Sequence, residues 1–264
     1  MRSERIKMSL LCCFMLVTLL TFASLRAADY QIGPGDLLRI NVFDHQELAL
    51  EARVSQSGNI TYPLIGVVQV GGKSTHQVES LIAQKLSAGS FIRNPQVSVD
   101  IGDFQSQKVG VVGQVNKPGQ YALTGDQTVL EVLTMAGGLV TEFAADDGTL
   151  IHKDGSTQPL DLRRLLDGDP AMNVQMKNGD TLSVPRAAQF YIYGEVQKPG
   201  VYRLGRNMTV SQGISTGGGL TKNGTERRAI VKRRDASGKE KEYSIKPTDM
   251  LQANDVLLIK HSLF

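Results

Sequence analysis

The residue types that most often carry chemistry occur in this sequence without the spacing that chemistry needs. The four histidines are scattered along the chain at His45, His76, His152 and His261. None of them belongs to an HExxH pattern, which would place two imidazoles on one helix face for a metal ion. We therefore predict no metal site.

The carboxylates do not indicate catalysis either. Glycoside cleavage needs two carboxylates about 5–10 Å apart across a sugar, and no spacing in the sequence favours such a pair. Asp146 and Asp147 are adjacent in a polar stretch with no partner in view, and we interpret them as a solvated turn. We predict no catalytic residues and no cofactor, and we predict that the protein is not an enzyme.

Two glycine-rich stretches partly match nucleotide-binding loops. Residues 71–75 read GGKST, but the phosphate-binding motif needs a glycine where the chain has Val67. Residues 33–35 read GPG, and position 38 is a leucine where a dinucleotide fingerprint needs glycine. Ser74 followed by Gln77 predicts instead a capping box that opens a helix.

Residues 1–27 have the layout of a secretory signal peptide, with basic residues before an apolar run that ends at Arg26. A transmembrane anchor would need about 20 apolar residues, and this run is shorter. The leader holds four of the 29 basic residues and one of the 26 acidic ones, so 25 of each remain. Zero net charge does not favour nucleic-acid binding. Cys12 and Cys13 also lie in the leader, in a context that does not fit a lipidation signal, so the mature chain has no thiol.

One phrase of eleven residues occurs twice. Residues 113–123 read GQVNKPGQYAL and residues 194–204 read GEVQKPGVYRL, with seven identical positions at an offset of 81. Proline at the second turn position and glycine with positive φ at the third predict a type II turn in each copy. Tyr121 and Tyr202 follow and are expected to pack in the core, so we interpret the phrase as scaffold. The turn residues are Lys117, Pro118, Gly119, Lys198, Pro199 and Gly200.

Each copy continues with the same helix signals. Thr128 with Glu131, and Thr209 with Gln212, have the spacing of capping boxes. A glycine pair follows each predicted helix, at 137–138 and at 218–219, where a left-handed residue ends helices. A turn pair then precedes a closing strand, and the pairs are Gly35-Asp36, Gly179-Asp180 and Asn254-Asp255.

These elements predict an α+β protein of three domains after the leader. Residues 28–104 combine short alternating strands with one helix, and the two copies of a β-grasp-like unit follow at 107–186 and 189–264. The charged stretches 146–173 and 225–247 are expected to be polar hairpins or loops on the outside.

The repeat resembles the soluble-ligand-binding β-grasp (SLBB) family. The preceding segments GPGDLLRINVF, GNITYPLIGVVQVGGKST and IRNPQVSVDI closely resemble the N-terminal domain of bacterial polysaccharide export proteins. One such domain followed by SLBB repeats resembles the outer-membrane polysaccharide export (OPX) family, over residues 30–260.

The resemblance implies a homo-oligomeric ring around a periplasmic passage for a secreted polysaccharide, associated with the outer membrane and working with an inner-membrane polysaccharide co-polymerase. Long family members carry a lipidated cysteine and a C-terminal spanning helix. Here no lipid signal fits and the last predicted strand ends near Lys260. We therefore expect a separate outer-membrane β-barrel to complete the crossing.

Two alternatives stay open at this point. A monomeric periplasmic SLBB module would bind a soluble ligand, and a glycan-modifying enzyme would shorten the polymer. The chain has no Trp and 6% aromatic residues, which favours a wet passage over a tight sugar-binding pocket.

Overall fold

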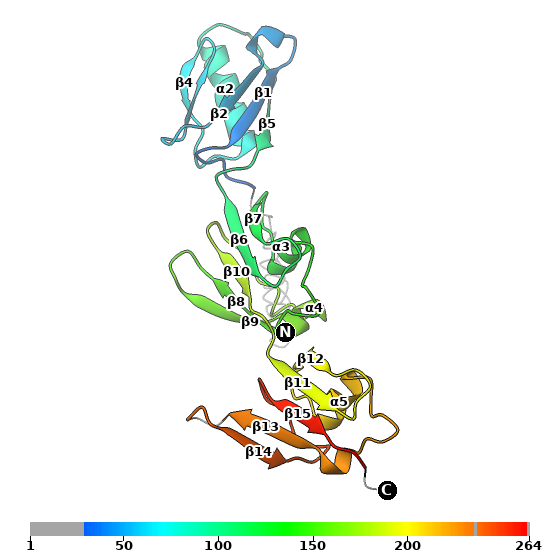
Figure 1. Cartoon of the computed structure of the whole chain (residues 1–264). Helices are drawn as coiled ribbons and strands as arrows, with labels where there is room; N and C mark the ends of the chain where they lie inside the picture. The colour runs from blue at the N-terminus through cyan, green and yellow to red at the C-terminus, as the bar shows by residue number, and fades with distance from the viewer. Residues whose placement is uncertain (1–28, 235–236, 263–264) are drawn as a thin grey trace, which may run out of the picture.

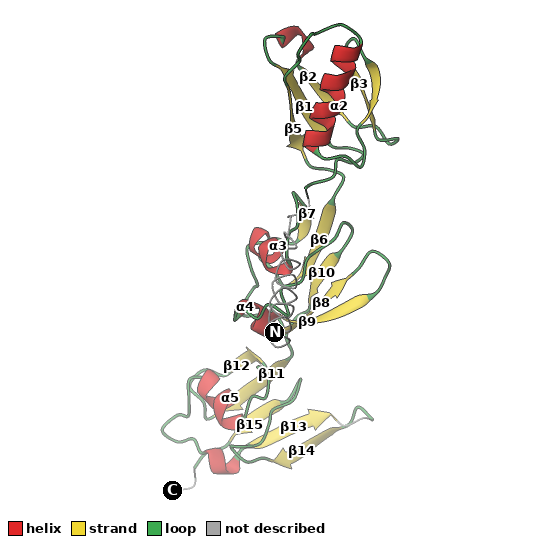
Figure 2. Cartoon of the chain, turned by 180° about the vertical axis from the view of Figure 1, so that it is seen from behind, coloured by secondary structure: helices red, strands yellow, loops and turns green. Residues whose placement is uncertain are grey.

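The computed structural model describes residues 29–234 and 237–262, and these form three units placed end to end (Figures 1 and 2). Three separate clusters of buried apolar residues form one core in each unit. Helices and sheets are mixed within every unit, so the fold class is α+β, as predicted. The predicted signal peptide lies outside the described residues.

The N-terminal unit packs one helix on a three-stranded antiparallel sheet of order β2-β1-β5, with the two-stranded β3-β4 ribbon beside it. Val78, Ile82 and Leu86 recur every four residues on α2 and are fully buried. They meet the buried alternate residues of β1, which gives the core. The elements are β1 (Leu37–Val42), η2 (Gln46–Leu48), β2 (Leu50–Arg53), β3 (Asn59–Tyr62), β4 (Gly66–Gln69), α2 (Thr75–Ala88) and β5 (Val97–Asp103).

The next two units repeat one topology, and we call them the first repeat (β6 to β10) and the second repeat (β11 to β15). Their sheets have the orders β7-β6-β10-β8-β9 and β12-β11-β15-β13-β14, with one parallel pair in each, β6 with β10 and β11 with β15. The first repeat contains β6 (Lys108–Gly113), β7 (Gly119–Ala122), α3 (Val129–Met135), β8 (Asp147–Ile151), β9 (Thr157–Asp161), α4 (Leu162–Leu166) and β10 (Thr181–Val184). The second contains β11 (Gln189–Gly194), β12 (Gly200–Arg203), α5 (Val210–Thr216), η3 (Glu226–Arg228), β13 (Ile230–Arg234), β14 (Glu240–Ser244) and β15 (Val256–Ile259).

The charged stretches differ from the prediction in part. The hairpin β8-β9 lies in 146–173 and the hairpin β13-β14 lies in 225–247. The first stretch also contains α4, whose Leu162 and Leu165 are fully buried. Residues 146–173 therefore contribute to the core of the first repeat, because the apolar pair on α4 is masked in the sequence by the charges around it. The second stretch contains Ala229 and Val231, which are fully buried in the core of the second repeat.

The predicted type II turns are wrong. Neither Gly119 nor Gly200 has the positive φ that such a turn requires at its third position. Within the two phrases, the glycines with positive φ are Gly113 and Gly194, at φ 95° and 92°, at the start of each phrase. The chain turns away from the sheet there and makes a wider loop before it returns as β7 or β12.

Gly113 and Gly194 are also the tightest backbone contacts in the two repeats. A Cβ added to Gly113 would lie 1.9 Å from the carbonyl oxygen of Val184, and one added to Gly194 would lie 2.1 Å from that of Ile259. Both oxygens belong to the last residue of the neighbouring parallel strand. Only glycine fits at these two positions.

We expect Gly113→Ala to lower the free energy of unfolding of the first repeat by about 1–3 kcal/mol, because the backbone must adopt a strained φ and move off Val184. Thermal unfolding followed by circular dichroism measures the change. Gly119→Ala is the matched control, since nothing lies within 4 Å of its added Cβ. Equal losses from the two variants would contradict the steric explanation.

Candidate functional site

The first KPG loop lies on the end of helix α3. The backbone N–H of Lys117 donates to the carbonyl of Ala136 at 2.9 Å, and that of Asn116 donates to Gly138 at 3.0 Å. The hydroxyl of Tyr121 donates to the carbonyl of Lys117. The loop thus satisfies backbone groups at the helix end that would otherwise lack partners.

The second KPG loop makes the same contacts. The N–H groups of Lys198 and Gln197 donate to Gly217 at 2.8 Å and Gly219 at 3.0 Å, and the Tyr202 hydroxyl donates to Lys198 at 2.7 Å. The phrase therefore joins a strand connection to a helix end in both repeats. Neither loop brings together groups that could act on a substrate.

The predicted cap residues lie at helix starts. Thr128 accepts from the N–H of Glu131 while the Glu131 carboxylate accepts from the N–H of Thr128, and Thr209 with Gln212 does the same. Ser74 in GGKST opens α2 in this way. These side chains satisfy free N–H groups of the first helical turn.

Three buried aspartates occupy equivalent places, which we call the aspartate sockets. Asp36, Asp180 and Asp255 have exposed fractions of 0%, 2% and 0% and directly precede or open the strands β1, β10 and β15. Each carboxylate accepts a hydrogen bond from the backbone N–H three residues earlier. The distances are 2.8 Å from Gly33, 2.8 Å from Lys177 and 2.7 Å from Gln252.

A different side chain closes each socket of the repeats. His152 Nδ1 lies 3.1 Å from Asp180, and Arg233 donates from Nε and Nη2 to Asp255, both at 2.7 Å. These hydrogen bonds raise the pKa of Arg233 above its ordinary value. The sequence pattern indicated a turn pair at each aspartate, but it could not indicate burial or these partners, because they are distant in sequence.

The N-terminal socket is closed by neutral groups. Asp36 accepts from the Tyr30 hydroxyl at 2.9 Å and from Ser106 Oγ at 2.8 Å, and the N–H groups of Gln105 and Ser106 each donate at 2.8 Å. Residues 105–106 lead into the first repeat. Asp36 therefore also ties the exit of the N-terminal unit to its core.

Two arginines of the second repeat hold the first repeat, and we call this contact the arginine clamp. Arg203 donates to the carbonyl of Ala144 at 2.9 Å and to Asp146 at 2.5 Å. Arg206 donates to Asp147 and Asp161, both at 2.7 Å. The interpretation of Asp146 and Asp147 as a solvated pair is wrong for Asp146, whose side chain is only 15% exposed. The side chain of Asp147 is 76% exposed, as expected, but it also binds a guanidinium group from the next unit. No local sequence signal marks this contact.

The described residues contain no group of three or more His, Cys, Asp or Glu side chains that could hold a metal ion. Within the same residues, no helix has the length and apolar character needed to cross a membrane.

Three sequence profiles match the chain along this architecture. The profile of the polysaccharide biosynthesis/export protein family matches residues 25–102, and SLBB domain profiles match residues 107–184 and 189–245. The fold is therefore that of a modular chain with one export-type domain and two tandem SLBB domains.

The similar proteins are export proteins. The EPS I polysaccharide export outer membrane protein EpsA of Ralstonia nicotianae is 29% identical over 251 residues, covering 83% of this chain and 65% of the relative. The polysialic acid transport protein KpsD of Escherichia coli is 26% identical over 237 residues, covering 88% and 42%. The capsule polysaccharide export outer membrane protein CtrA of Neisseria meningitidis is 23% identical over 190 residues, covering 70% and 47%.

The chain thus contains one domain of the polysaccharide biosynthesis/export protein family and two SLBB domains, and its relatives are polysaccharide export proteins. It spans less than two thirds of the length of the relatives named above.

We expect Arg233→Met to lower the free energy of unfolding of the second repeat by about 2–3 kcal/mol, because Asp255 stays buried without its charged partner. Chemical denaturation measures the loss. Lys232→Met is the matched control. Lys232 is next to Arg233 on β13, and its ion pairs are with the exposed Glu240 and Glu242, at 3.8 and 3.3 Å. A loss from Lys232→Met as large as that from Arg233→Met would contradict the socket explanation.

Replacing Arg203 and Arg206 together by alanine is expected to loosen the joint between the repeats without unfolding either one. Small-angle X-ray scattering should show a broader spread of molecular dimensions, while the unfolding temperatures stay nearly constant. Alanine at Arg227 and Arg228, which are exposed on η3, removes equal charge away from the joint. An unchanged scattering curve for the clamp variant would contradict the prediction.

The clamp also has a defined pH response. The hydrogen bond from Arg206 lowers the pKa of the Asp161 carboxyl. Because the pKa is lowered, the carboxylate of Asp161 stays charged even somewhat below the ordinary aspartate value of about 3.9, at which a free carboxylate takes up its proton. The contact is therefore fully present above this value and is lost as the pH falls through the lowered pKa.

Proposed function

We propose that this protein exports a secreted polysaccharide, exopolysaccharide or capsule, by forming a homo-oligomeric ring around a periplasmic passage at the outer membrane. The observation that carries the proposal is the order of an export-type domain and two SLBB domains in one chain. Relatives named as export outer membrane proteins share this region. A cleavable signal peptide without lipidation would deliver the chain to the periplasm.

The arrangement of the polar groups supports a passage rather than a catalyst. The buried carboxylates of Asp36, Asp180 and Asp255 are occupied by backbone N–H groups and fixed side chains. A catalytic carboxylate must instead be free to meet a substrate. We infer that the chain is not an enzyme.

The elongated shape also supports the proposal. Three units follow one another in a row (Figure 1), and the clamp and Asp36 join them. Copies placed side by side would line a long passage, and such ring contacts are heterologous. We further propose domain limits of 28–104, 107–186 and 189–264, and an inner-membrane co-polymerase as the partner that delivers the polymer.

Deletion of the gene in the producing organism is expected to abolish surface polysaccharide while precursor synthesis continues, and the wild-type gene should restore secretion. Light scattering on the purified protein is expected to give the mass of a closed oligomer. Unchanged secretion would contradict the export function. A stable monomer that binds a small ligand with micromolar affinity would favour a periplasmic ligand-binding module instead.

A further inference from the structure

The sheet of the second repeat has one covered face and one open face. Phe190 and Ile192 of β11 are buried and pack with Val210 and Ile214 of α5 in one core. Side chains alternate along a strand, so Tyr191 and Tyr193 lie on the opposite face. They are 38% and 39% exposed. Tyrosines at positions i and i+2 form a pair on one open surface.

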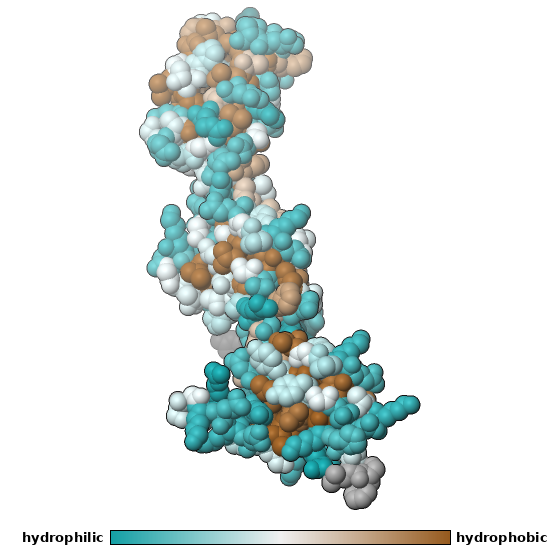
Figure 3. Space-filling model, in the orientation of Figure 1, coloured by the Kyte–Doolittle hydropathy of each residue, from teal (hydrophilic) through white to brown (hydrophobic). Residues whose placement is uncertain are grey.

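Neighbouring strands extend this pair into a larger apolar surface. Strand register places Tyr191 between Val201 and Val256, and it places Tyr193 beside Leu258. Val201 is 52% exposed. Figure 3 shows hydrophobic surface gathered over the second repeat with hydrophilic surface around it. We call these five residues the tyrosine face.

The first repeat shows that the scaffold does not need these side chains. Strand pairing is the same in both repeats, so each position has an equivalent. Tyr191 and Tyr193 correspond to Gly110 and Val112. The remaining equivalents are Gln120 for Val201, Thr181 for Val256 and Ser183 for Leu258. The same sheet therefore forms with small and polar residues, and the aromatic pair has a role other than folding.

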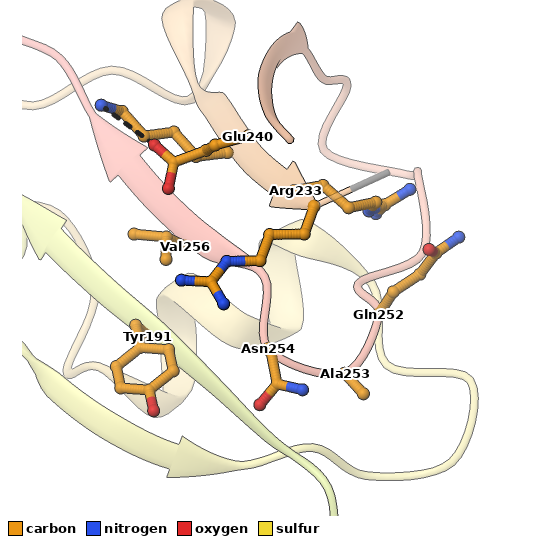
Figure 4. A pocket seen from close by; sticks show the side chains of 9 residues that line it. Tyr191, Arg233, Glu240, Gln252, Ala253, Asn254 and Val256 are labelled. Atoms are coloured by element: carbon orange, nitrogen blue, oxygen red, sulfur yellow. Dashed lines mark ion pairs between the residues drawn. The ribbon is translucent and has the colours of Figure 1, made fainter. Parts of the chain in front are cut away.

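Two hollows meet at Tyr191 and Val256. One has a volume of about 480 Å³ and is also lined by Tyr193, Val201 and Pro199. The other has a volume of about 510 Å³ and lies at the end of the sheet, with Tyr191 and Val256 on one side (Figure 4). Its polar lining consists of Lys232, Arg233, Arg234, Glu240, Gln252 and Asn254.

The polar hollow offers hydrogen-bonding groups without excess charge. Lys232 lies 3.3 Å from Glu242 and 3.8 Å from Glu240, Arg233 is bound to the buried Asp255, and Arg234 is opposite Glu240 in the strand register. Three cations are therefore matched by three carboxylates. An anion would need uncompensated cations, whereas sugar hydroxyls need mixed donors and acceptors. The amides Gln252 and Asn254 supply both.

We propose that the tyrosine face and the adjoining polar hollow bind a pyranose segment of a neutral carbohydrate chain. The ring of Tyr191 stacks on the apolar C–H side of a sugar, because the negative face of an aromatic ring attracts such groups. Gln252, Asn254 and Glu240 hydrogen-bond the hydroxyls, and Tyr193 supports the neighbouring part of the chain. That this carbohydrate is the exported polysaccharide rests on the proposed function.

The alternative to a sugar on the tyrosine face is a second copy of this chain. The core of a protein interface is depleted in charged residues. Here four charged side chains and two amides line half of the site. This composition favours a sugar, with its many hydroxyls, over another protein surface.

The test measures binding to the polysaccharide purified from the producing organism, by retardation of the full mature protein in gels that contain it. Wild type is expected to be retarded, and Tyr191→Ala to bind about tenfold more weakly, as expected for loss of one aromatic stacking contact. Tyr191→Leu keeps an apolar side chain without the ring and should lose as much. Tyr243→Ala, at a tyrosine 43% exposed on β14 of the same repeat, is the matched control and should bind as wild type does.

Each other outcome overturns the proposal. No retardation of wild type, full binding by Tyr191→Ala, or full binding by Tyr191→Leu contradicts stacking on this ring. A change of oligomer mass in Tyr191→Ala with unchanged polysaccharide binding assigns the face to a second copy. Thermal unfolding of every variant checks that the fold is intact, and Tyr193→Ala gives a second readout of the same face if Tyr191→Ala is unstable.

Secretion by the wild-type gene in the deletion strain separates this proposal from the proposed function. Restored secretion without polysaccharide binding contradicts the sugar site and leaves the export function standing. Binding that depends on Tyr191, together with no effect of the gene on secretion, contradicts the export function and supports the sugar site.

Discussion

A buried carboxylate next to the start of a strand is the constraint on which each unit of this protein depends. Asp36, Asp180 and Asp255 are withdrawn from water, and a buried carboxylate is tolerated only when hydrogen bonds surround it. The N–H three residues earlier provides one bond, and a positive φ at the residue before each aspartate bends the chain to present it. The strands that follow, β1, β10 and β15, are the middle strands of their sheets. Each socket therefore lies at the start of the strand on which the neighbouring strands of its sheet pair.

The three sockets share the contacts made by neighbouring residues and differ in the contacts made by residues distant in the sequence. The turn and its N–H donor recur in all three units, while the closing group is Tyr30 with Ser106, then His152, then Arg233. The same turn and buried carboxylate can therefore recur in units that differ in topology and in the residues around the carboxylate. The backbone supplies the common geometry, and any side chain that can donate a hydrogen bond completes it.

Repetition of one scaffold leaves its surfaces free to diverge. The first repeat presents carboxylates to the joint and the second presents guanidinium groups, so the two copies complement each other in the clamp. The open sheet faces differ as well, small and polar in the first repeat and aromatic in the second. Because the cores are separate, neither change disturbs packing in the other unit. One chain therefore carries surfaces of different chemistry along a row of three units.

The sequence by itself determined the features that depend on a few neighbouring residues. The α+β class, the duplicated unit and the helix starts at Thr128 and Thr209 were predictable, because capping boxes and strand alternation are local patterns. The type II turns were predicted wrongly because the loop is shaped by the helix end that it covers, and the positive φ lies at Gly113 instead. Only the tertiary structure decided the partners of Asp146 and Asp147, the burial of the sockets and the open face around Tyr191. Those features join residues far apart in the sequence, and their energies arise from distances and burial that exist only after the chain has folded.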